Sequence, residues 1–293
     1  MIDFIINPIA GGKHGKKTRK TVAILKQRLE EQGVEYAFHL TNRKGHAKTL
    51  TQTLIERGAT DIIAVGGDGT LHEVINGFSN FENVNLGLIP CGTGNDFASA
   101  LKIPLNPEKA LDIILDNKLG YVDFMQMPDV RGINIIGTGI DVDVLKRYNA
   151  SKKKNKLAYT SCLVKTLFNF DYTDFDAEID GEKSHFRSFV ACIANGHVYG
   201  GGIPVCPVAT PNDGALDFVA VGAMKKIKII GAFIKLKKGK VLTLKQAVHK
   251  KFDNIKIDLP KPYVVNVDGE LYENIDFEIR IVKNTLKMYH NIV

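Results

Sequence analysis

Two glycine-rich acidic turns are the part of this sequence best suited to chemistry. They read GGDGT at residues 66–70 and GTGND at residues 92–96. Glycine lets a backbone approach a bulky anion closely, and N–H groups at a helix start point toward such an anion. The carboxylates of Asp68 and Asp96 can hold a divalent cation beside it. The pair of turns therefore predicts a site for a nucleoside triphosphate with its metal, and phosphoryl transfer as the reaction.

The elements that must position these turns follow a regular pattern. Apolar runs typical of buried strands alternate with segments whose apolar residues recur at helical spacing. Repeated strand–helix units of this kind predict a parallel sheet with helices on both faces. The predicted strands cover residues 2–6, 34–40, 61–65 and 85–89, and the predicted helices cover residues 18–32, 46–57 and 70–77.

Ligands of parallel α/β sheets bind beyond the carboxyl ends of the strands. Four parts of the sequence reach that edge: the loop of residues 7–12, Thr41 just past the second strand, and the two glycine-rich turns. Their shared position argues for a nucleotide site more strongly than any single motif, because an Asp-Gly pair alone is also a good turn former.

The predicted secondary structure changes after about residue 125, from alternating strands and helices to mainly strands. Segments typical of strands follow one another, many of them joined by Asp-Gly turns, at residues 132–137, 174–180, 186–195, 215–222, 252–258, 262–267 and 274–283. Helical stretches near residues 141–149, 155–169 and 225–236 interrupt them. This pattern predicts a mainly antiparallel β-sandwich as a second domain.

We therefore divide the chain into a nucleotide-binding α/β domain of residues 1–126 and a β-rich substrate domain of residues 127–283. Residues 284–293 are expected to rejoin the first domain. A cleft between two domains is the natural place for an active site.

Composition sets limits on the class of protein. The chain is 44% hydrophobic and 24% charged, as in folded globular proteins. No apolar run approaches the roughly 20 residues that span a bilayer, and the N-terminus lacks the pattern of a secretory signal. The four cysteines are scattered without metal-ligand spacing, which disfavours structural zinc and favours a reducing cytoplasm.

The net charge of +7 is unevenly placed. Residues 225–251 contain ten lysines and no carboxylate, and further basic clusters lie in residues 13–20 and 146–156. Any one cluster is typical of a solvated face. Together they favour reversible contact with an anionic membrane surface. Nucleic acid is disfavoured, because aromatic residues do not interleave with the lysines as base stacking requires.

Familiar nucleotide-binding motifs are missing. Residues 11–18 approach the Walker A pattern but fail its spacing, and no dinucleotide-binding glycine motif opens the first helix. The catalytic set of the protein kinases is also missing. A nucleotide would therefore be held mostly by backbone donors and hydroxyl groups.

These motifs point to a family. The chain resembles the soluble diacylglycerol kinases, whose catalytic domain is shared with sphingoid-base and ceramide kinases and is distantly similar to NAD kinase. The resemblance extends in order over nearly the whole chain, and its longest stretch is the most specific. The matching segments are residues 7–11 (NPIAG), 66–72 (GGDGTLH), 89–98 (IPCGTGNDFA) and 267–270 (VDGE).

The resemblance implies a role for each matching residue. Asp68, Asp96 and Asp123 match an acidic network that holds catalytic Mg²⁺, and Glu270 matches the proton acceptor. The family often has asparagine where this chain has His72. The residues that correspond to ATP-binding elements are Asn7, Pro8, Ile9, Ala10, Gly11, Thr41, Gly66, Gly67, Asp68, Gly69, Thr70, Leu71, His72 and Thr93.

Glu270 also makes chemical sense by itself. Phosphoryl transfer to an alcohol benefits from a carboxylate that accepts the hydroxyl proton and orients the nucleophile. The sequence around it leaves two alternatives open. Asp268-Gly269 is a hairpin signal, so this segment can be purely structural. Asp268 is the rival base.

A second metal is implied by the loop of residues 210–217. In similar bacterial enzymes this loop holds a structural Mg²⁺, and the corresponding ligands are Asp213 with the carbonyl groups of Thr210 and Ala215. A turn without metal is the alternative, because one carboxylate makes a weak Mg²⁺ site. The loop of residues 195–202 is expected to line a lipid cleft, with His197 as a polar wall residue.

The sequence thus predicts an ATP-dependent lipid kinase that phosphorylates diacylglycerol to phosphatidic acid with Mg²⁺. It is expected to be cytoplasmic and peripheral at the membrane, and the resemblance implies a homodimer. A kinase for another lipid alcohol, such as a sphingoid base, and an enzyme like NAD kinase are the alternatives. A non-enzymatic alternative is a nucleotide- or lipid-binding regulator. The presence of Asp68, Asp96 and Glu270 argues against it, because a protein without catalytic activity has no chemical need for all three.

Overall fold

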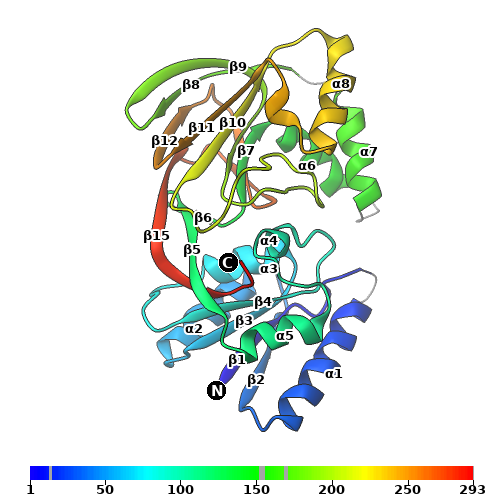
Figure 1. Ribbon diagram of the computed structural model, residues 1–293, viewed down its shortest axis with the longest axis vertical. Coiled ribbons are helices and arrows are strands. Elements are labelled where there is room, and N and C mark those ends of the chain that lie inside the picture. The colour runs from blue at the N-terminus through cyan, green and yellow to red at the C-terminus, as the bar shows by residue number, and fades with distance from the viewer. Residues whose placement is uncertain (13–14, 152–155, 168–170, 293) are drawn as a thin grey trace. The chain divides into compact units, whose positions relative to one another are not determined.

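The computed structural model describes residues 1–12, 15–151, 156–167 and 171–292 (Figure 1). The chain forms two compact units. Unit 1 contains residues 1–122 and 283–293, and unit 2 contains residues 123–282. The chain passes from one unit to the other within strands β5 (Leu119–Gln126) and β15 (Glu278–Tyr289). Basic residues 13 and 152–154 of the predicted lysine clusters lie outside the described residues.

Unit 1 is built on a parallel sheet, as predicted. Strand β1 lies between β2 and β3, and β3 pairs with β4, all in parallel. The end of β15 adds to β4, again in parallel, with Lys287 opposite Asn85. The bounds are β1 (Ile2–Ile6), β2 (Tyr36–Leu40), β3 (Asp61–Gly66) and β4 (Asn85–Pro90).

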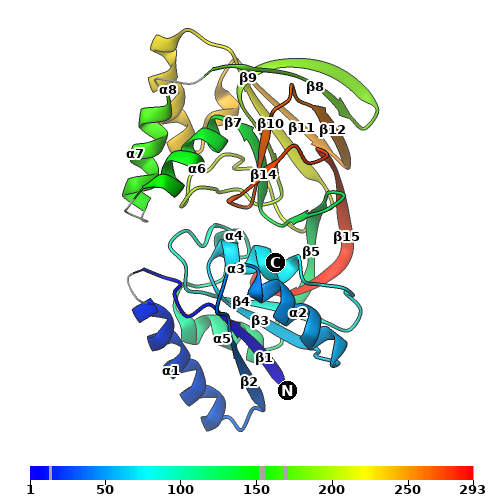
Figure 2. The same ribbon diagram turned by 180° about the vertical axis from the view of Figure 1, so that it is seen from behind.

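Helices cover both faces of this sheet. The connections from β1 to β2 and from β2 to β3 run in opposite directions across the sheet, so right-handed crossovers place their helices on opposite faces (Figure 2). Helix α1 packs on α5, where Arg28 forms an ion pair of 2.7 Å with Asp112. The helices are α1 (Lys16–Glu31), α2 (His46–Glu56), α3 (Asp68–Ile75), α4 (Asp96–Ala100) and α5 (Pro107–Leu115).

Unit 2 is mainly antiparallel. The long strand β9 pairs with β8 through its first half and with β7 and β10 through its second half. The strands are β6 (Arg131–Gly132), β7 (Ile135–Gly139), β8 (Thr173–Ile179), β9 (Glu182–Ala194), β10 (Leu216–Gly222), β11 (Ala247–Phe252), β12 (Asn254–Asp258), β13 (Val264–Val267) and β14 (Glu270–Glu273). Two-residue Asp-Gly turns with positive φ at both positions join β8 to β9 and β13 to β14, as the sequence predicted.

Alternation along β9 and β10 divides the interior of unit 2 into two cores. Ala191 and Ile193 face a core between strands, whereas Cys192 and Ala194 face a core covered by helices. The helices over the second core are α6 (Ile140–Ala150), α7 (Lys156–Leu167) and α8 (Lys226–Lys237) (Figure 1). Among the described helices, none is long and apolar enough to cross a membrane.

Candidate functional site

The two glycine-rich turns meet in unit 1. A Cβ atom on Gly92 would overlap the Cα atom of Gly67, so the two backbones approach as closely as only glycine allows. The contact is fixed by hydrogen bonds from the backbone N–H of Cys91 to the carbonyl of Gly66 (2.7 Å) and from Gly92 to the same carbonyl (3.2 Å). The turns follow neighbouring parallel strands, which explains their convergence.

The first loop of the chain joins the same edge. The Asn7 side chain donates a hydrogen bond of 3.2 Å to the Thr70 hydroxyl, and the Asn7 backbone N–H donates to the carbonyl of Val65. Thr41 directly follows the last residue of β2, and its backbone N–H donates a hydrogen bond of 2.9 Å to the carbonyl of Ile6. The loop of residues 7–12 and the first glycine-rich turn are thus bonded directly, and Thr41 lies at the end of the strand beside them. His72 is buried within α3.

Asp68 and Asp96 form an acidic pair at this edge. A Cβ atom on Gly94 would lie 2.8 Å from Oδ2 of Asp68 and 3.5 Å from Oδ2 of Asp96, so both carboxylates border one backbone position. Burial and the charge of Asp96 raise the pKa of Asp68 to about 7, although backbone N–H groups of residues 95–97 partly offset this. The pair holds a proton near neutral pH unless a cation joins it.

This donor set suits a nucleotide with Mg²⁺. The half-buried Asp68 and the buried Asp96 repel each other and supply the hard oxygen ligands that Mg²⁺ prefers, and a divalent charge would favour ionisation of both. A buried acceptor is also left over, because Oδ1 of Asn95 has no hydrogen-bond partner among the described residues. The backbone N–H groups at the starts of α3 and α4 are the donors that phosphate groups would use beside these side chains.

Asp123 belongs to unit 2 and is nearly buried. Its carboxylate accepts a hydrogen bond of 2.8 Å from the backbone N–H of Gly214, and its own N–H donates to the carbonyl of Pro211 (2.7 Å). Asn195 donates its side-chain N–H to the Asp123 carbonyl (2.7 Å). Asp123 therefore anchors the loop of residues 210–215, a role that the sequence did not predict.

Glu270 opens strand β14, directly after the turn formed by Asp268 and Gly269. The hairpin alternative is thus correct as a description of the backbone, but it does not exclude a chemical role for the side chain. Glu270 pairs with Val267 across the hairpin and is half-buried. The adjacent strand β13 carries Asn266, whose side-chain oxygen accepts a hydrogen bond of 2.9 Å from the Gly269 backbone N–H.

Asp268 has a different surrounding from Glu270. Its two carboxylate oxygens accept hydrogen bonds from the backbone N–H groups of Ile133 (2.8 Å), Asn134 (2.9 Å) and Ile135 (3.1 Å). The carboxylate is buried and organises the start of β7. These contacts favour Glu270 over Asp268 as the proton acceptor.

We expect Asp268→Asn to destabilise the protein by about 1–3 kcal/mol, because an amide NH₂ would replace one of the two accepting oxygens. Asparagine tolerates positive φ as well as aspartate does, so the turn itself is preserved. Chemical denaturation measures the loss. Unchanged stability together with a collapse of turnover would contradict this assignment and make Asp268 the base.

The predicted structural Mg²⁺ loop contains a competing cation. Nζ of Lys251 lies 2.6 Å from Oδ2 of Asp213 and 3.5 Å from Oδ2 of the buried Asp217. Partial burial lowers the pKa of Lys251, but hydrogen bonds and the charges of both carboxylates raise it on balance, so the ammonium stays charged. The Thr210 carbonyl accepts the Asp213 N–H (3.4 Å). These residues do not fit a structural Mg²⁺ ion without displacement of Lys251.

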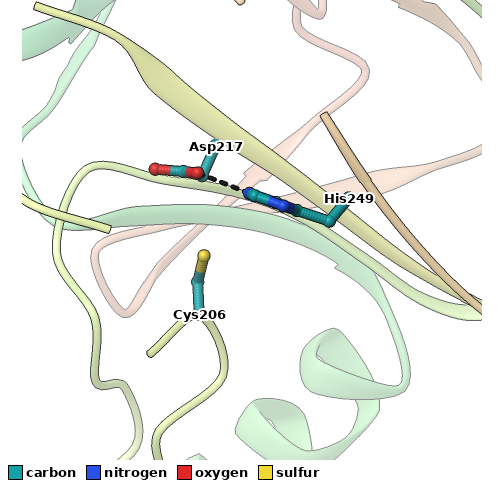
Figure 3. A group of neighbouring side chains, drawn as sticks. All are labelled: Cys206, Asp217 and His249. Atoms are coloured by element: carbon teal, nitrogen blue, oxygen red, sulfur yellow. Dashed lines mark hydrogen bonds and ion pairs between the residues drawn. The ribbon is translucent and has the colours of Figure 1, made fainter. Parts of the chain in front are cut away.

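The Lys251 ammonium also contacts a cluster of possible metal ligands, Cys206, Asp217 and His249, through Asp217. Figure 3 shows the Asp217 carboxylate joined to the His249 imidazole by a hydrogen bond of 2.5 Å, with the Cys206 thiol beside them. Donor atoms of these three residues lie within 4.8 Å of one another. However, burial and the charge of Asp217 raise the pKa of Cys206 to about 12, so the thiol is protonated. With the thiol protonated and Lys251 already paired with Asp217, the cluster offers no vacant set of anionic ligands for a metal ion.

An apolar cavity lies beneath the helices of unit 2. Its volume is about 80 Å³, and it is lined by side chains of α6, α7, α8 and the strands below. Its polar members include Asp141 and Tyr199, both of which bond to the side-chain amide of Asn266, at 3.0 Å for Asp141. Tyr199 comes from the loop of residues 195–202 that was expected to line a lipid cleft.

Asp141 was not singled out from the sequence. One carboxylate oxygen, Oδ1, is buried without a hydrogen-bond partner among the described residues. Burial raises the pKa of Asp141 to about 6, against the lowering effects of the hydrogen bond from Asn266 and of the backbone N–H groups of Val142 and Asp141 itself. The cavity is therefore apolar, with one unsatisfied acceptor at the end where Asp141 accepts the hydrogen bond from Asn266 of β13. Nothing in the local sequence distinguishes Asp141 from Asp143, which is exposed on the same helix.

Comparison with known proteins finds similarity over nearly the whole chain. The model of the diacylglycerol kinase catalytic domain matches residues 2–127, and that of the YegS C-terminal NAD kinase beta sandwich-like domain matches residues 134–290. A protein named "Probable lipid kinase YegS-like" from Alcanivorax borkumensis is 30% identical, with 88% of each chain covered. A diacylglycerol kinase from Bacillus subtilis is 29% identical, with 91% of this chain and 88% of that one covered.

The fold is similar to solved structures as well. The crystal structure of a diacylglycerol kinase from Bacillus anthracis str. Sterne superimposes with a TM-score of 0.74 at 23% identity, over 99% of this chain and 96% of that chain. This likeness concerns the fold. It confirms the predicted combination of a parallel α/β domain with a β-sandwich.

Proposed function

The chain belongs to the family of lipid kinases with a diacylglycerol kinase catalytic domain, and we propose that its own acceptor is diacylglycerol. As a member of this family it is a phosphotransferase with an alcohol acceptor. The proposed reaction transfers the γ-phosphate of ATP to the free hydroxyl and yields phosphatidic acid. The observation that carries the proposal is the cavity of unit 2, which combines an almost wholly apolar lining with one unsatisfied carboxylate oxygen.

The apolar lining of this cavity suits an acceptor with hydrocarbon chains, which would enter as the side chains of α7 and α8 move apart. Acyl chains would replace apolar side-chain contacts without the loss of hydrogen bonds that a polar acceptor would suffer there. A hydroxyl or ester-bearing headgroup would lie at the polar end, where Oδ1 of Asp141 lacks a donor. NAD, which is large and charged, suits such a lining poorly.

The polar end of the cavity is connected to Glu270 by two hydrogen bonds through one side chain. Asn266 donates to Asp141 with its amide N–H (3.0 Å) and accepts from Gly269 with its amide oxygen (2.9 Å). Glu270 is the next residue after Gly269. We propose that Glu270 accepts the proton of the acceptor hydroxyl and orients it for attack, while Asn266 fixes the hairpin relative to the cavity.

ATP is proposed to bind at the glycine-rich edge of unit 1. The backbones of residues 66–70 and 92–94 would accommodate the phosphates, and the hydroxyl groups of Thr41, Thr70 and Thr93 would add donors. Ile9, whose side chain is exposed in the first loop, would cover the base. Asp68 and Asp96, with Asp123 in the implied network, would hold Mg²⁺, which neutralises charge on the phosphates when bound.

The raised pKa of Asp141 predicts a dependence of stability on pH. The pKa is about 6 in the folded protein and 3.8 ordinarily, so the folded state retains a proton that the unfolded state loses between these values. Stability therefore falls as pH rises from about 4 to 6 and stays lower above, by at most about 3 kcal/mol for this group. Asp141→Asn should abolish that contribution.

The measurement is the difference in unfolding free energy between wild type and Asp141→Asn at pH 4.5, 6 and 8. Because other carboxylates titrate equally in both proteins, only this group changes the difference. Asp143→Asn on the same helix is the matched control, since its side chain is exposed. A difference that is constant with pH would contradict the raised pKa of Asp141.

The experiment that tests the proposed function is a panel of acceptors with labelled ATP. Diacylglycerol, a sphingoid base and NAD are each offered with Mg²⁺, and the labelled product is identified. Transfer to diacylglycerol above all others supports the proposal, whereas preference for the sphingoid base or NAD replaces it. ATP binding without transfer to any acceptor would indicate a nucleotide- or lipid-binding regulator.

A further inference from the structure

Helix α8 has two faces of different kinds. Ile229, Ala232, Phe233 and Leu236 line the cavity and recur at the spacing of one helical face. Between them, Ile230 and Ile234 expose 51% and 49% of their surface. These two residues are four positions apart and therefore form a continuous aliphatic ridge on the outside of the helix.

Helix α7 repeats the arrangement. Tyr159, Leu163 and Leu167 line the same cavity, while Leu157 and Val164 expose 83% and 38% of their surface. Residues seven positions apart lie on the same side of a helix, two turns from each other. A single exposed aliphatic residue is common on soluble proteins. Four of them on the two helices that cover one apolar cavity are a pattern that needs a partner.

Lysines surround the aliphatic residues of α8. Lys228, Lys235, Lys237 and Lys238 are all exposed, and no carboxylate occurs from residue 225 to residue 252. The ammonium group of Lys237 lies 5.7 Å from the ring of Phe233, at the border of the cavity lining. An aliphatic ridge with a cationic rim matches the two layers of an anionic bilayer, whose charged headgroups overlie hydrocarbon.

We propose that this surface, called the α7–α8 face and made of Leu157, Val164, Ile230, Ile234 and the four exposed lysines, docks on an anionic lipid bilayer. Docking places the helices that cover the cavity against the membrane, so a lipid reaches the cavity from the bilayer between or beneath them. This inference rests on the proposed function for the identity of that lipid, but the docking itself is independent of catalysis.

The test compares Ile230→Gln/Ile234→Gln with wild type in sedimentation with vesicles. Glutamine forms helices well and both positions are exposed, so folding and net charge are kept. Vesicles of phosphatidylcholine with about one third phosphatidylglycerol should bind wild type, with weaker binding at high salt. We expect at least about tenfold weaker binding for the double variant, since two apolar side chains no longer insert.

Leu40→Gln/Leu105→Gln is the matched control, because it removes two exposed leucines that lie elsewhere. It should bind like wild type. Equal binding of the α8 double variant, no binding of wild type to anionic vesicles, or an equal loss in the control would overturn the proposal. Lys228→Gln/Lys238→Gln should weaken binding and reduce its dependence on salt, and an unchanged salt dependence would also count against it.

Turnover separates this inference from the proposed function. Phosphorylation of a dissolved short-chain diacylglycerol should be equal in wild type and the α8 double variant, whereas phosphorylation of diacylglycerol embedded in vesicles should fall about tenfold. If wild type docks through this face but phosphorylates neither form, the proposed acceptor is wrong and the docking surface stands. If the double variant retains full activity on vesicles, the docking surface is wrong and the acceptor stands.

Discussion

Glu270→Gln is expected to lower turnover by about 10²–10⁴-fold while the affinity for ATP stays unchanged. Glutamine keeps the size of the side chain and its ability to accept one hydrogen bond, but it cannot take up the proton of the acceptor hydroxyl. Glu270 belongs to unit 2, and the residues proposed for ATP binding belong to unit 1, so the substitution leaves the nucleotide site itself unaltered.

The design requires a control on the same strand. Glu273→Gln changes the charge of the hairpin equally, and Glu273 is the exposed residue at the other end of β14. Steady-state kinetics with saturating ATP and titration of ATP binding give the two readouts. Turnover of Glu270→Gln close to that of Glu273→Gln would refute the assignment of the base.

Much of the fold could be predicted because its signals are local. The apolar runs before residues 66 and 92 specify two buried strands, and each is followed by the glycines that let the chain turn back. Asp180-Gly181 and Asp268-Gly269 specify tight hairpins, since both positions adopt positive φ. The predicted strand of residues 252–258 includes only the last residue of β11, because the sequence AVHKKF has three polar residues in succession and lacks alternation.

The parts of the site that could not be predicted depend on pairs distant in the sequence. Lys251 reaches Asp213 because β11 pairs with β10, which places Lys251 opposite Asp217. The sequence could not decide between Asp268 and Glu270 as the base. The choice depends on the hydrogen bonds that Asp268 accepts from the backbone N–H groups of residues 133–135. The position of Asp141 in an apolar cavity could not be predicted, because the apolar side chains around it come from α7 and α8.

Asp68→Asn is expected to reduce turnover by at least about 10²-fold and, at pH 8 without Mg²⁺, to stabilise the protein. The two effects have one cause. The pKa of Asp68 is about 7 in the folded protein and 3.8 ordinarily, so stability falls as pH rises from about 4 through 7. Asparagine removes both the buried charge and its repulsion with Asp96, and it also removes the ligand that would hold Mg²⁺.

Thermal denaturation with and without Mg²⁺ and ATP measures both consequences. Ligands that bind only the folded state stabilise wild type by about 2.7 kcal/mol at a hundred times their dissociation constant. Asp68→Asn should lose most of this gain, whereas Glu108→Gln, a neutralised and exposed carboxylate in α5, should retain it. A variant that keeps both turnover and stabilisation by Mg²⁺ would exclude Asp68 from the metal site.

A double-mutant cycle with Asp96→Asn then tests whether the two carboxylates act as a pair. Each single substitution relieves the same repulsion, so the second should add little stability at pH 8 once the first is present. At pH 5, where the folded pair already holds its proton, the gain from either substitution should be much smaller. Fully additive gains that do not depend on pH would mean that Asp68 and Asp96 titrate separately, and the argument for a shared cation between them would fail.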